Sequence, residues 1–239
     1  GKYDSVFSYV KNNIDDVQED LVLMFAGEKI PSGIQEYAAT AQELKTKEEI
    51  YSAMVVYGLL TYENGRVFIP NKELMGSYAA MMKKEKSLGY IYRLANLSEQ
   101  MLQATLAGDT GTMTQIIQYA HNTEVPILSY NNETELSAIV NLVYLSARDR
   151  YRVEREDRAG KGYVDFIFYP LRADQDGIIL ELKVNQTPDD AITQIKEREY
   201  ALRFKGKLAE KTVHTGRILA VGIGYNKVTK EHACKVEEL

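Results

Sequence analysis

Two carboxylates and one lysine stand in segments where charged side chains are costly. Asp165 lies among the apolar and aromatic residues of GYVDFIFYP, and Glu181 and Lys183 lie among the aliphatic residues of IILELKV. Both segments predict β-strands, in which side chains two residues apart point to the same face. Glu181 and Lys183 therefore share a face. The turn-forming sequence DQDG at 174–177 predicts that the two strands pair, which would bring Asp165 beside them.

This group of charges predicts a metal site rather than an ion pair kept for packing, because such a pair rarely recovers the cost of its desolvation. Two converging carboxylates, Asp165 and Glu181, suit a hard cation such as Mg²⁺ (or Mn²⁺), which keeps several waters and accepts phosphate oxygens. A bound cation can lower the pKa of a water, while Lys183 orients that water or stabilises charge on the phosphate. The implied reaction is hydrolysis of a phosphodiester.

The elements that would position these residues alternate between helix and strand in the second half of the chain. Thr187-Pro188 predicts a helix start with proline in the first turn, and this helix is long enough to connect two parallel strands. We therefore expect an αβββαβ order and a mixed sheet flanked by helices, in the α+β or α/β class. The predicted segments are a helix at 133–147, strands at 151–156, 163–169 and 178–184, a helix at 188–203 and a strand at 218–225.

Asp165 followed by Glu181-Leu182-Lys183 within this αβββαβ order resembles the PD-(D/E)XK nuclease superfamily. Val164 stands where the family signature has proline, and ELK fits the E-X-K part of the signature. The resemblance implies a restriction-endonuclease-like core and metal-dependent cleavage of a nucleic acid, which we expect to be DNA. It assigns Asp165 and Glu181 as metal ligands and Lys183 as the residue that positions or activates water.

The same resemblance implies further site residues on the two helices. In related nucleases a glutamate of the first helix often joins the metal site; Glu133 is the first choice here and Glu135 the alternative. An acidic residue that only stabilises the helix N-terminus is the competing interpretation of Glu133. Gln194 and Tyr200, in QIKEREY, look like the glutamine and tyrosine of RecB-type nucleases, where they contact substrate or the site. A surface amide and a core tyrosine are the competing interpretations of these two residues.

More closely, the stretch from about 130 to 239 looks like the nuclease domain that follows an AAA-ATPase-like domain in a large group of bacterial proteins. The segments that carry this resemblance are REDRAGKGYVDFIFYP, ILELKV, AITQIKEREYALRFKGK and ILAVGIGYNK. The chain contains no GxxxxGK[ST] phosphate loop, so we expect no ATP hydrolysis. The expected partner is an ATPase-like domain of a longer protein, of which this chain would be a C-terminal fragment.

The first half of the chain predicts a helical region at 1–128, ahead of a nuclease-like domain at 129–239. Within it, residues of about 46–84 predict a winged-helix-like unit. A helix with a Thr46 and Glu49 capping box is followed by a hairpin turn at Asn64-Gly65. This unit also resembles the tail of the ATPase-like module, and because it lacks a basic recognition face we favour an interdomain or protein contact over DNA binding.

Three more helices are expected in this half of the chain. The first opens at Asn71 or Lys72 and runs to about Lys84, and the other two cover roughly 95–107 and 110–121. Gly108 and Gly111 separate the last two. We expect these helices to belong to the helical region.

The composition excludes several classes of protein. With 45% hydrophobic and 26% charged residues in 239, the chain is globular rather than disordered. Its apolar runs are far shorter than a membrane span and no charged-then-apolar leader opens it, so we expect a soluble protein without membrane contact. The only cysteine, Cys234, cannot pair within the chain, which favours the cytoplasm.

The net charge of −5 argues against a general nucleic-acid coat, because nonspecific affinity comes mostly from basic residues. It favours a second hypothesis, in which a catalytically silent nuclease fold serves as a binding or regulatory module for the ATPase-like domain. The intact set of Asp165, Glu181 and Lys183 favours the enzyme. The sequence leaves open whether the protein forms a homo-oligomer.

Overall fold

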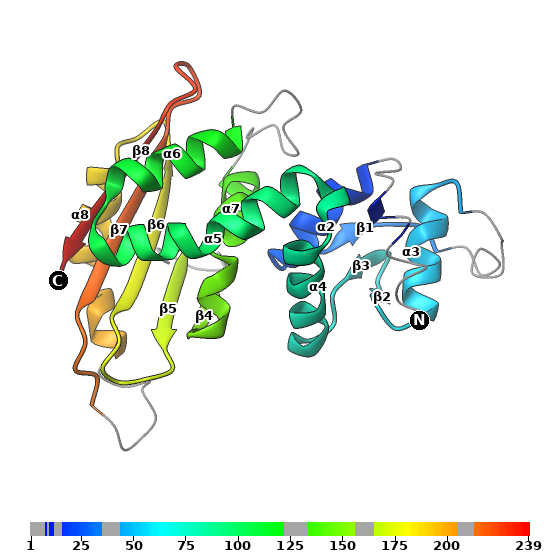
Figure 1. Cartoon of the computed structure of the whole chain (residues 1–239), viewed down its shortest axis with the longest axis horizontal. Helices are drawn as coiled ribbons and strands as arrows, with labels where there is room; N and C mark the ends of the chain where they lie inside the picture. Colours follow the sequence, from blue (N-terminus) through cyan, green and yellow to red (C-terminus); the bar gives the residue numbers. More distant parts are fainter. Residues whose placement is uncertain are drawn as a thin grey trace. The chain divides into compact units, whose positions relative to one another are not determined.

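The computed structural model describes residues 8, 10, 11, 16–34, 44–121, 133–155, 165–204 and 213–239 of the chain. These residues form two compact units (Figure 1). The described residues up to Asn96 form the first unit, and those from Leu97 onward form the second. None of the helices in the described ranges is long and apolar enough to cross a membrane.

The first unit combines helices with a small antiparallel sheet of strand order β1-β3-β2. Helix α5 (Tyr90–Ala107) starts in this unit, and its residues from Leu97 belong to the second. The other elements are α2 (Val17–Phe25), β1 (Ile30–Pro31), α3 (Lys47–Val56), β2 (Thr61–Glu63), β3 (Arg66–Phe68), α4 (Lys72–Lys84) and the 3₁₀ turn η3 (Lys86–Leu88).

Two local signals of the first unit produce the expected structures. The Thr46 hydroxyl accepts a hydrogen bond from the Glu49 amide, and the Glu49 carboxylate accepts one from the Thr46 amide, which completes the capping box of α3. Asn64 and Gly65, with φ of 51° and 75°, form the turn between β2 and β3. The order of helix, hairpin and helix is as predicted, and the winged-helix assignment of 46–84 stays a prediction.

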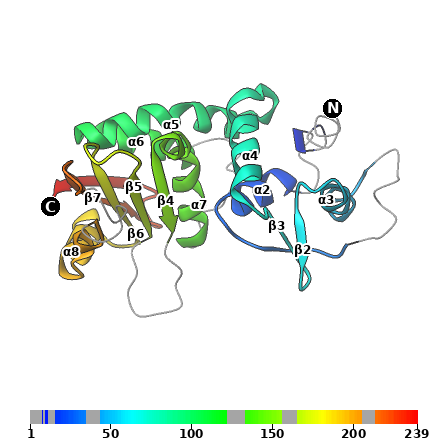
Figure 2. The same cartoon turned by 90° about the horizontal axis from the view of Figure 1, so that it is seen from below.

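The second unit is built around a five-stranded mixed sheet of order β4-β5-β6-β7-β8, in which only β6 and β7 are parallel. Helix α8 lies on one face of this sheet and α6 on the other (Figures 1 and 2). Its elements after α5 are α6 (Thr110–His121), α7 (Glu133–Val143), η4 (Leu145–Asp149), β4 (Tyr151–Arg155), β5 (Phe166–Pro170), β6 (Gly177–Val184), α8 (Pro188–Glu197), η5 (Tyr200–Arg203), β7 (Ile218–Tyr225) and β8 (His232–Glu238).

Side chains of the central strands alternate between the two faces of this sheet. Those on the face covered by α8 form one buried cluster, and on the opposite face the ring of Phe168 contacts those of Tyr144 and Tyr151, with centroids 5.3 and 6.2 Å apart. Burial of aromatic rings on both faces fixes the register, because a slip by one residue would exchange the two faces. The cluster under α8 comprises Ile167, Tyr169, Ile179, Ile192, Ile195, Tyr200, Phe204 and Ala220.

Some element boundaries differ from those expected. The helix predicted at 133–147 ends as an α-helix at Val143 and continues as a 3₁₀ turn. The helix predicted at 188–203 stops at Glu197, because Glu199 adopts a left-handed conformation with φ of 52° and breaks the hydrogen-bond ladder. The 3₁₀ turn η5 that follows places Tyr200 in the core cluster.

Strand β8 was not predicted and closes the sheet beside β7. The preceding turn is stabilised by the Asn226 side chain, whose Oδ1 accepts hydrogen bonds from the amides of Val228 and Thr229. Charged residues such as Lys235 and Glu237 interrupt the apolar residues of this strand. A prediction based on hydrophobic runs therefore does not identify the segment as a strand.

The grouping into units also differs from the domain boundary expected at residue 128. Helix α6 packs on β8: the Gln118 side chain donates a hydrogen bond to the carbonyl of Lys230 at 3.0 Å and accepts one from the His232 amide at 3.0 Å. Residues 97–121 therefore group with the sheet rather than with the helical region, because their apolar face is buried within the second unit.

Candidate active site

Asp165 directly precedes β5, and Glu181 lies in the neighbouring strand β6. Phe166, the first residue of β5, pairs with Leu180 of β6, so Asp165 and Glu181 are the residues that follow this pair on the two chain segments. The Leu182 amide donates a hydrogen bond of 2.7 Å to Asp165 Oδ2, which fixes this carboxylate at the end of β5. The pairing of the two strands expected from the turn at 174–177 is thus present.

Glu181, Lys183 and Gln194 form a hydrogen-bonded triangle on the face of the sheet that α8 covers. The Lys183 ammonium donates to Glu181 Oε1 at 3.0 Å and also to Gln194 Oε1, and Gln194 Nε2 donates to the same Glu181 oxygen. The Glu181 residue is only 3% exposed, whereas Lys183 is partly open to solvent. Charges at such depth are kept in place by their mutual bonds.

Two glycines of β7 explain how Gln194 of α8 comes so close to the sheet. Gly222 lies beside Glu181 in the parallel register and Gly224 lies beside Lys183. A Cβ atom built on Gly222 would lie 2.3 Å from the carbonyl oxygen of Pro188, and one on Gly224 would lie 2.9 Å from that of Gln186. The absence of side chains at these two positions lets the start of α8 approach β7.

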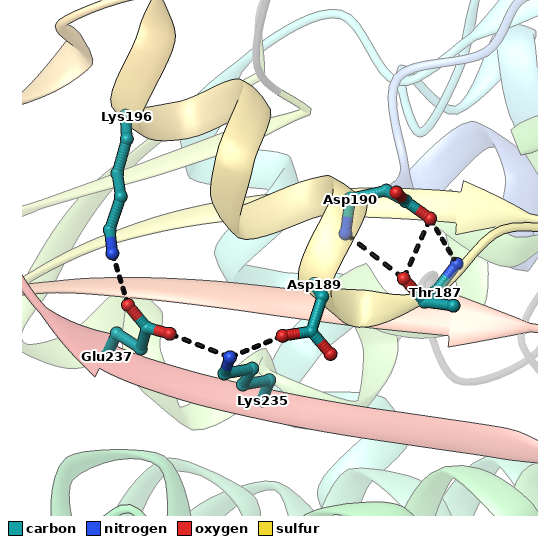
Figure 3. Close-up of polar contacts among 6 residues, drawn as sticks. All are labelled: Thr187, Asp189, Asp190, Lys196, Lys235 and Glu237. Atoms are coloured by element: carbon teal, nitrogen blue, oxygen red, sulfur yellow. Dashed lines mark hydrogen bonds and ion pairs between the residues drawn. The ribbon is translucent and has the colours of Figure 1, made fainter.

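The start of α8 is fixed by local bonds as well. Thr187 is its N-cap, and Pro188 occupies the first turn as predicted. The Asp190 amide donates to the Thr187 hydroxyl, and the Asp190 carboxylate accepts from the Thr187 amide at 2.8 Å (Figure 3). These bonds set where the helix begins, and so the position of Gln194 further along it.

Tyr200 lies at the border between the core and the charged group. Tyr200 is 4% exposed and packs in the buried cluster under α8. This position agrees with the interpretation of Tyr200 as a core tyrosine. Its hydroxyl accepts a hydrogen bond from the Arg198 guanidinium. Burial raises the pKa of the Tyr200 phenol, and the negative charges of Glu181 and Asp165 raise it further.

The glutamate of the first helix stays a prediction. Glu133 is the first residue of α7, but its side chain lies outside the described residues. Glu135, the alternative, is half-buried in the same helix.

The donor set fits a hard divalent cation. Asp165 and Glu181 supply two carboxylates from adjacent strands, the number of protein ligands with which Mg²⁺ is often held while waters and phosphate oxygens complete its shell. Across the described ranges no three His, Cys, Asp or Glu side chains gather as a fuller metal-binding cluster. The residues present suit a weakly held Mg²⁺ or Mn²⁺ rather than a structural zinc.

Comparison with known proteins agrees with this geometry. Residues 131–224 match a family model described as PD-(D/E)XK nuclease superfamily. This segment belongs to that superfamily. The match covers α7, strands β4, β5 and β6, α8 and nearly all of β7. It supports a restriction-endonuclease-like fold and indicates a nuclease-type function. No curated protein and no solved structure matches the chain.

Sequence reasoning overlooked two glycines at the nuclease-superfamily site and did not single out Arg198 among the basic residues of its segment. Gly222 and Gly224 are spaced by two in a predicted strand, a pattern that signals a close approach of another backbone. Arg198 lies at the end of α8 beside Tyr200. Its sequence context, QIKEREY, alternates basic and acidic residues and looks like an ordinary solvated helix face.

Proposed function

We propose that the second unit is a metal-dependent nuclease that hydrolyses phosphodiester bonds, with DNA as its substrate. The observation that supports this most directly is the hydrogen-bonded group of Glu181, Lys183 and Gln194, with the Asp165 carboxylate held by the Leu182 amide of strand β6. All of these residues lie inside the segment that matches the nuclease family. A pair of carboxylates with one ammonium is the set of groups that phosphodiester hydrolysis requires.

In hydrolysis the oxygen of water forms a bond to phosphorus, the bond from phosphorus to the leaving oxygen breaks, and the leaving oxygen takes a proton. The divalent cation, when bound by Asp165 and Glu181, supplies acidity to water and neutralises charge on the phosphate. Asp165 is oriented for this role by the Leu182 amide. Glu181 is oriented by Gln194.

Lys183 has one ammonium hydrogen available for the reaction. A lysine ammonium has three donors, and those of Lys183 bind Glu181 and Gln194 in the described structure, which leaves one. This third donor can hold the attacking water or a phosphate oxygen as negative charge develops. Gln194 acts as a positioning residue, since it fixes both the lysine and the glutamate.

The proposal is tested by incubating the protein with end-labelled single- and double-stranded DNA and RNA in Mg²⁺, Mn²⁺ or EDTA. We expect DNA cleavage that depends on the metal. The matched control is Glu181→Gln, which keeps a side-chain oxygen for Lys183 but removes the charge that binds the cation. Cleavage that is equal in wild type and Glu181→Gln, or no cleavage of any substrate, would contradict an enzymatic function.

A catalytically silent module is the second candidate. The net charge of −5 favours it, because a nuclease that works alone usually presents more positive surface. Magnesium that raises the melting temperature of the wild type without any cleavage would select this candidate. In both cases we propose an ATPase-like domain of the same protein as the partner, in the cytoplasm.

A further inference from the structure

Arg198 ends α8 on the side of the helix that faces the charged group. It lies four residues after Gln194, and its amide bonds to the Gln194 carbonyl at 3.2 Å, so the two residues lie one helical turn apart on one face. Gln194 contacts both Glu181 and Lys183. Arg198 is therefore placed on the same side of the helix as Gln194, whose amide contacts the site.

The Tyr200 hydroxyl holds this guanidinium near the carboxylates. It accepts a hydrogen bond from Arg198, and the negative charges of Glu181 and Asp165 act on the same phenol and raise its pKa. Tyr200 is itself anchored in the buried cluster, so it provides a rigid support for a long side chain that would otherwise sample many rotamers.

Two neighbouring lysines, Lys196 and Lys235, are neutralised by carboxylates, whereas among the described residues Arg198 has no such ion pair. Lys196 pairs with Glu237, and Lys235 pairs with both Asp189 and Glu237, which forms a chain of alternating charges between α8 and β8 (Figure 3). Within the described part of the chain, the exposed Arg198 guanidinium pairs with no carboxylate. Its charge thus stays available to an anion.

We propose that Arg198, held by Tyr200, binds a phosphate of the nucleic-acid backbone next to the one that is cleaved. The proposal rests on the nuclease function proposed above. A guanidinium suits this role because its planar N–H donors can bind two phosphate oxygens at once while it keeps its bond to a hydroxyl. Arg198 is then a substrate-positioning residue, distinct from the metal ligands and from Lys183.

The test compares Arg198→Ala with Lys196→Ala, which removes an equal charge from the same helix two residues away. Cleavage kinetics give kcat and KM, and binding of a fluorescent DNA oligonucleotide in EDTA gives Kd at several salt concentrations. We expect Arg198→Ala to raise KM and Kd by about 10-fold or more, and to reduce the slope of log Kd against log salt by about 1. Lys196→Ala should leave both close to wild type.

Two more variants separate positioning from charge and from folding. Arg198→Lys keeps the charge but not the two-pronged geometry, so it should restore the salt slope and only part of the affinity. Tyr200→Phe should raise KM in the same direction, because it removes the hydroxyl that holds the guanidinium. The melting temperature of Arg198→Ala should match that of the wild type, since this side chain is exposed.

The outcomes distinguish this inference from the proposed function. An active wild type whose Arg198→Ala and Lys196→Ala variants have equal KM and Kd would overturn the inference alone. A wild type that cleaves no nucleic acid would overturn both. An Arg198→Ala variant that lowers kcat with unchanged KM and Kd would also contradict a role in binding a flanking phosphate.

Discussion

Gly222 of β7 lies beside Glu181 of β6, and the carbonyl oxygen of Pro188 occupies the space that a side chain at residue 222 would need. The sheet face that carries Glu181 and the start of α8 therefore depend on the same glycine. A glycine remote in the sequence from both Glu181 and Gln194 thus controls how close these two residues come.

Gly222→Ala should destabilise the second unit and reduce activity. The new methyl would lie 2.3 Å from the Pro188 oxygen and 3.0 Å from Ala191 Cβ, so the start of α8 must move. Overpacking of this kind costs about 1–3 kcal/mol, measurable by urea unfolding. Gly111→Ala in α6 is the control, because its methyl would meet only an ordinary contact at 3.5 Å and helix propensity favours alanine. Equal stability changes in the two variants would contradict this account.

Much of the fold follows from the sequence because its signals are local. The alternation of GYVDFIFYP and IILELKV places Asp165 and Glu181 on one face, and the turn at 174–177 joins their strands. Pairing of β5 with β6 confirms that the turn joins two neighbouring antiparallel strands, and the shared face of Asp165 and Glu181 stays a prediction. Strand β8 and the grouping of residues 97–121 were not predicted, since they depend on which surface α6 covers rather than on any local pattern.

Tyr51 should make the first unit sensitive to alkaline pH. Its hydroxyl donates a 2.5 Å hydrogen bond to the Asp20 carboxylate, and burial raises the pKa of the phenol far above its ordinary value of 10.0. In the folded state the phenol keeps its proton where the unfolded chain loses it, so the free energy of unfolding falls as pH rises above 10. Below that pH the contribution is fully present.

Tyr51→Phe measures this contribution. The variant should lose about 1.5–3 kcal/mol at neutral pH, because a hydrogen bond to a buried carboxylate is removed. Urea unfolding at several pH values should show a shallower loss of stability above pH 10 than in the wild type. Tyr57→Phe, at an exposed tyrosine, should change neither quantity. Identical pH profiles for wild type and Tyr51→Phe would contradict the prediction.

The site was predicted in part from physics and in part from resemblance. Strand periodicity accounts for Glu181 and Lys183, whereas nothing in the sequence but family likeness singles out Gln194. Arg198 was not singled out because its role depends on the break at Glu199, whose left-handed conformation returns the chain to the core at Tyr200. A helix drawn through to residue 203 would have carried Tyr200 to a different face.

Asp165→Asn should weaken metal binding and cleavage together. Mg²⁺ that binds only the folded protein raises its melting temperature, and with two protein carboxylates the loss of one leaves few ligands to replace it. We expect a clear Mg²⁺-dependent rise for the wild type and little or none for Asp165→Asn, measured by thermal unfolding in EDTA and in Mg²⁺. Without metal, Asp165→Asn should be as stable as the wild type or more so, because repulsion from Glu181 is relieved. Asp174→Asn, at an exposed aspartate paired with Arg172, is the control.

Lys183→Ala should separate catalysis from metal binding. The lysine competes with a cation for the carboxylate of Glu181, to which it donates at 3.0 Å. Its removal leaves a nearly buried carboxylate without its ammonium, so the variant should be less stable than the wild type in EDTA. Mg²⁺ would then replace the lost positive charge, and the Mg²⁺-dependent rise in melting temperature should be at least as large as in the wild type.

Cleavage by Lys183→Ala should still fall by ~10² or more, because the donor that stabilises charge on the phosphate is gone. Lys196→Ala, which removes an exposed lysine, should behave as the wild type in both measurements. If the Mg²⁺ effect vanishes in Lys183→Ala, the lysine is needed to build the metal site; if cleavage is unchanged, it has no part in the reaction.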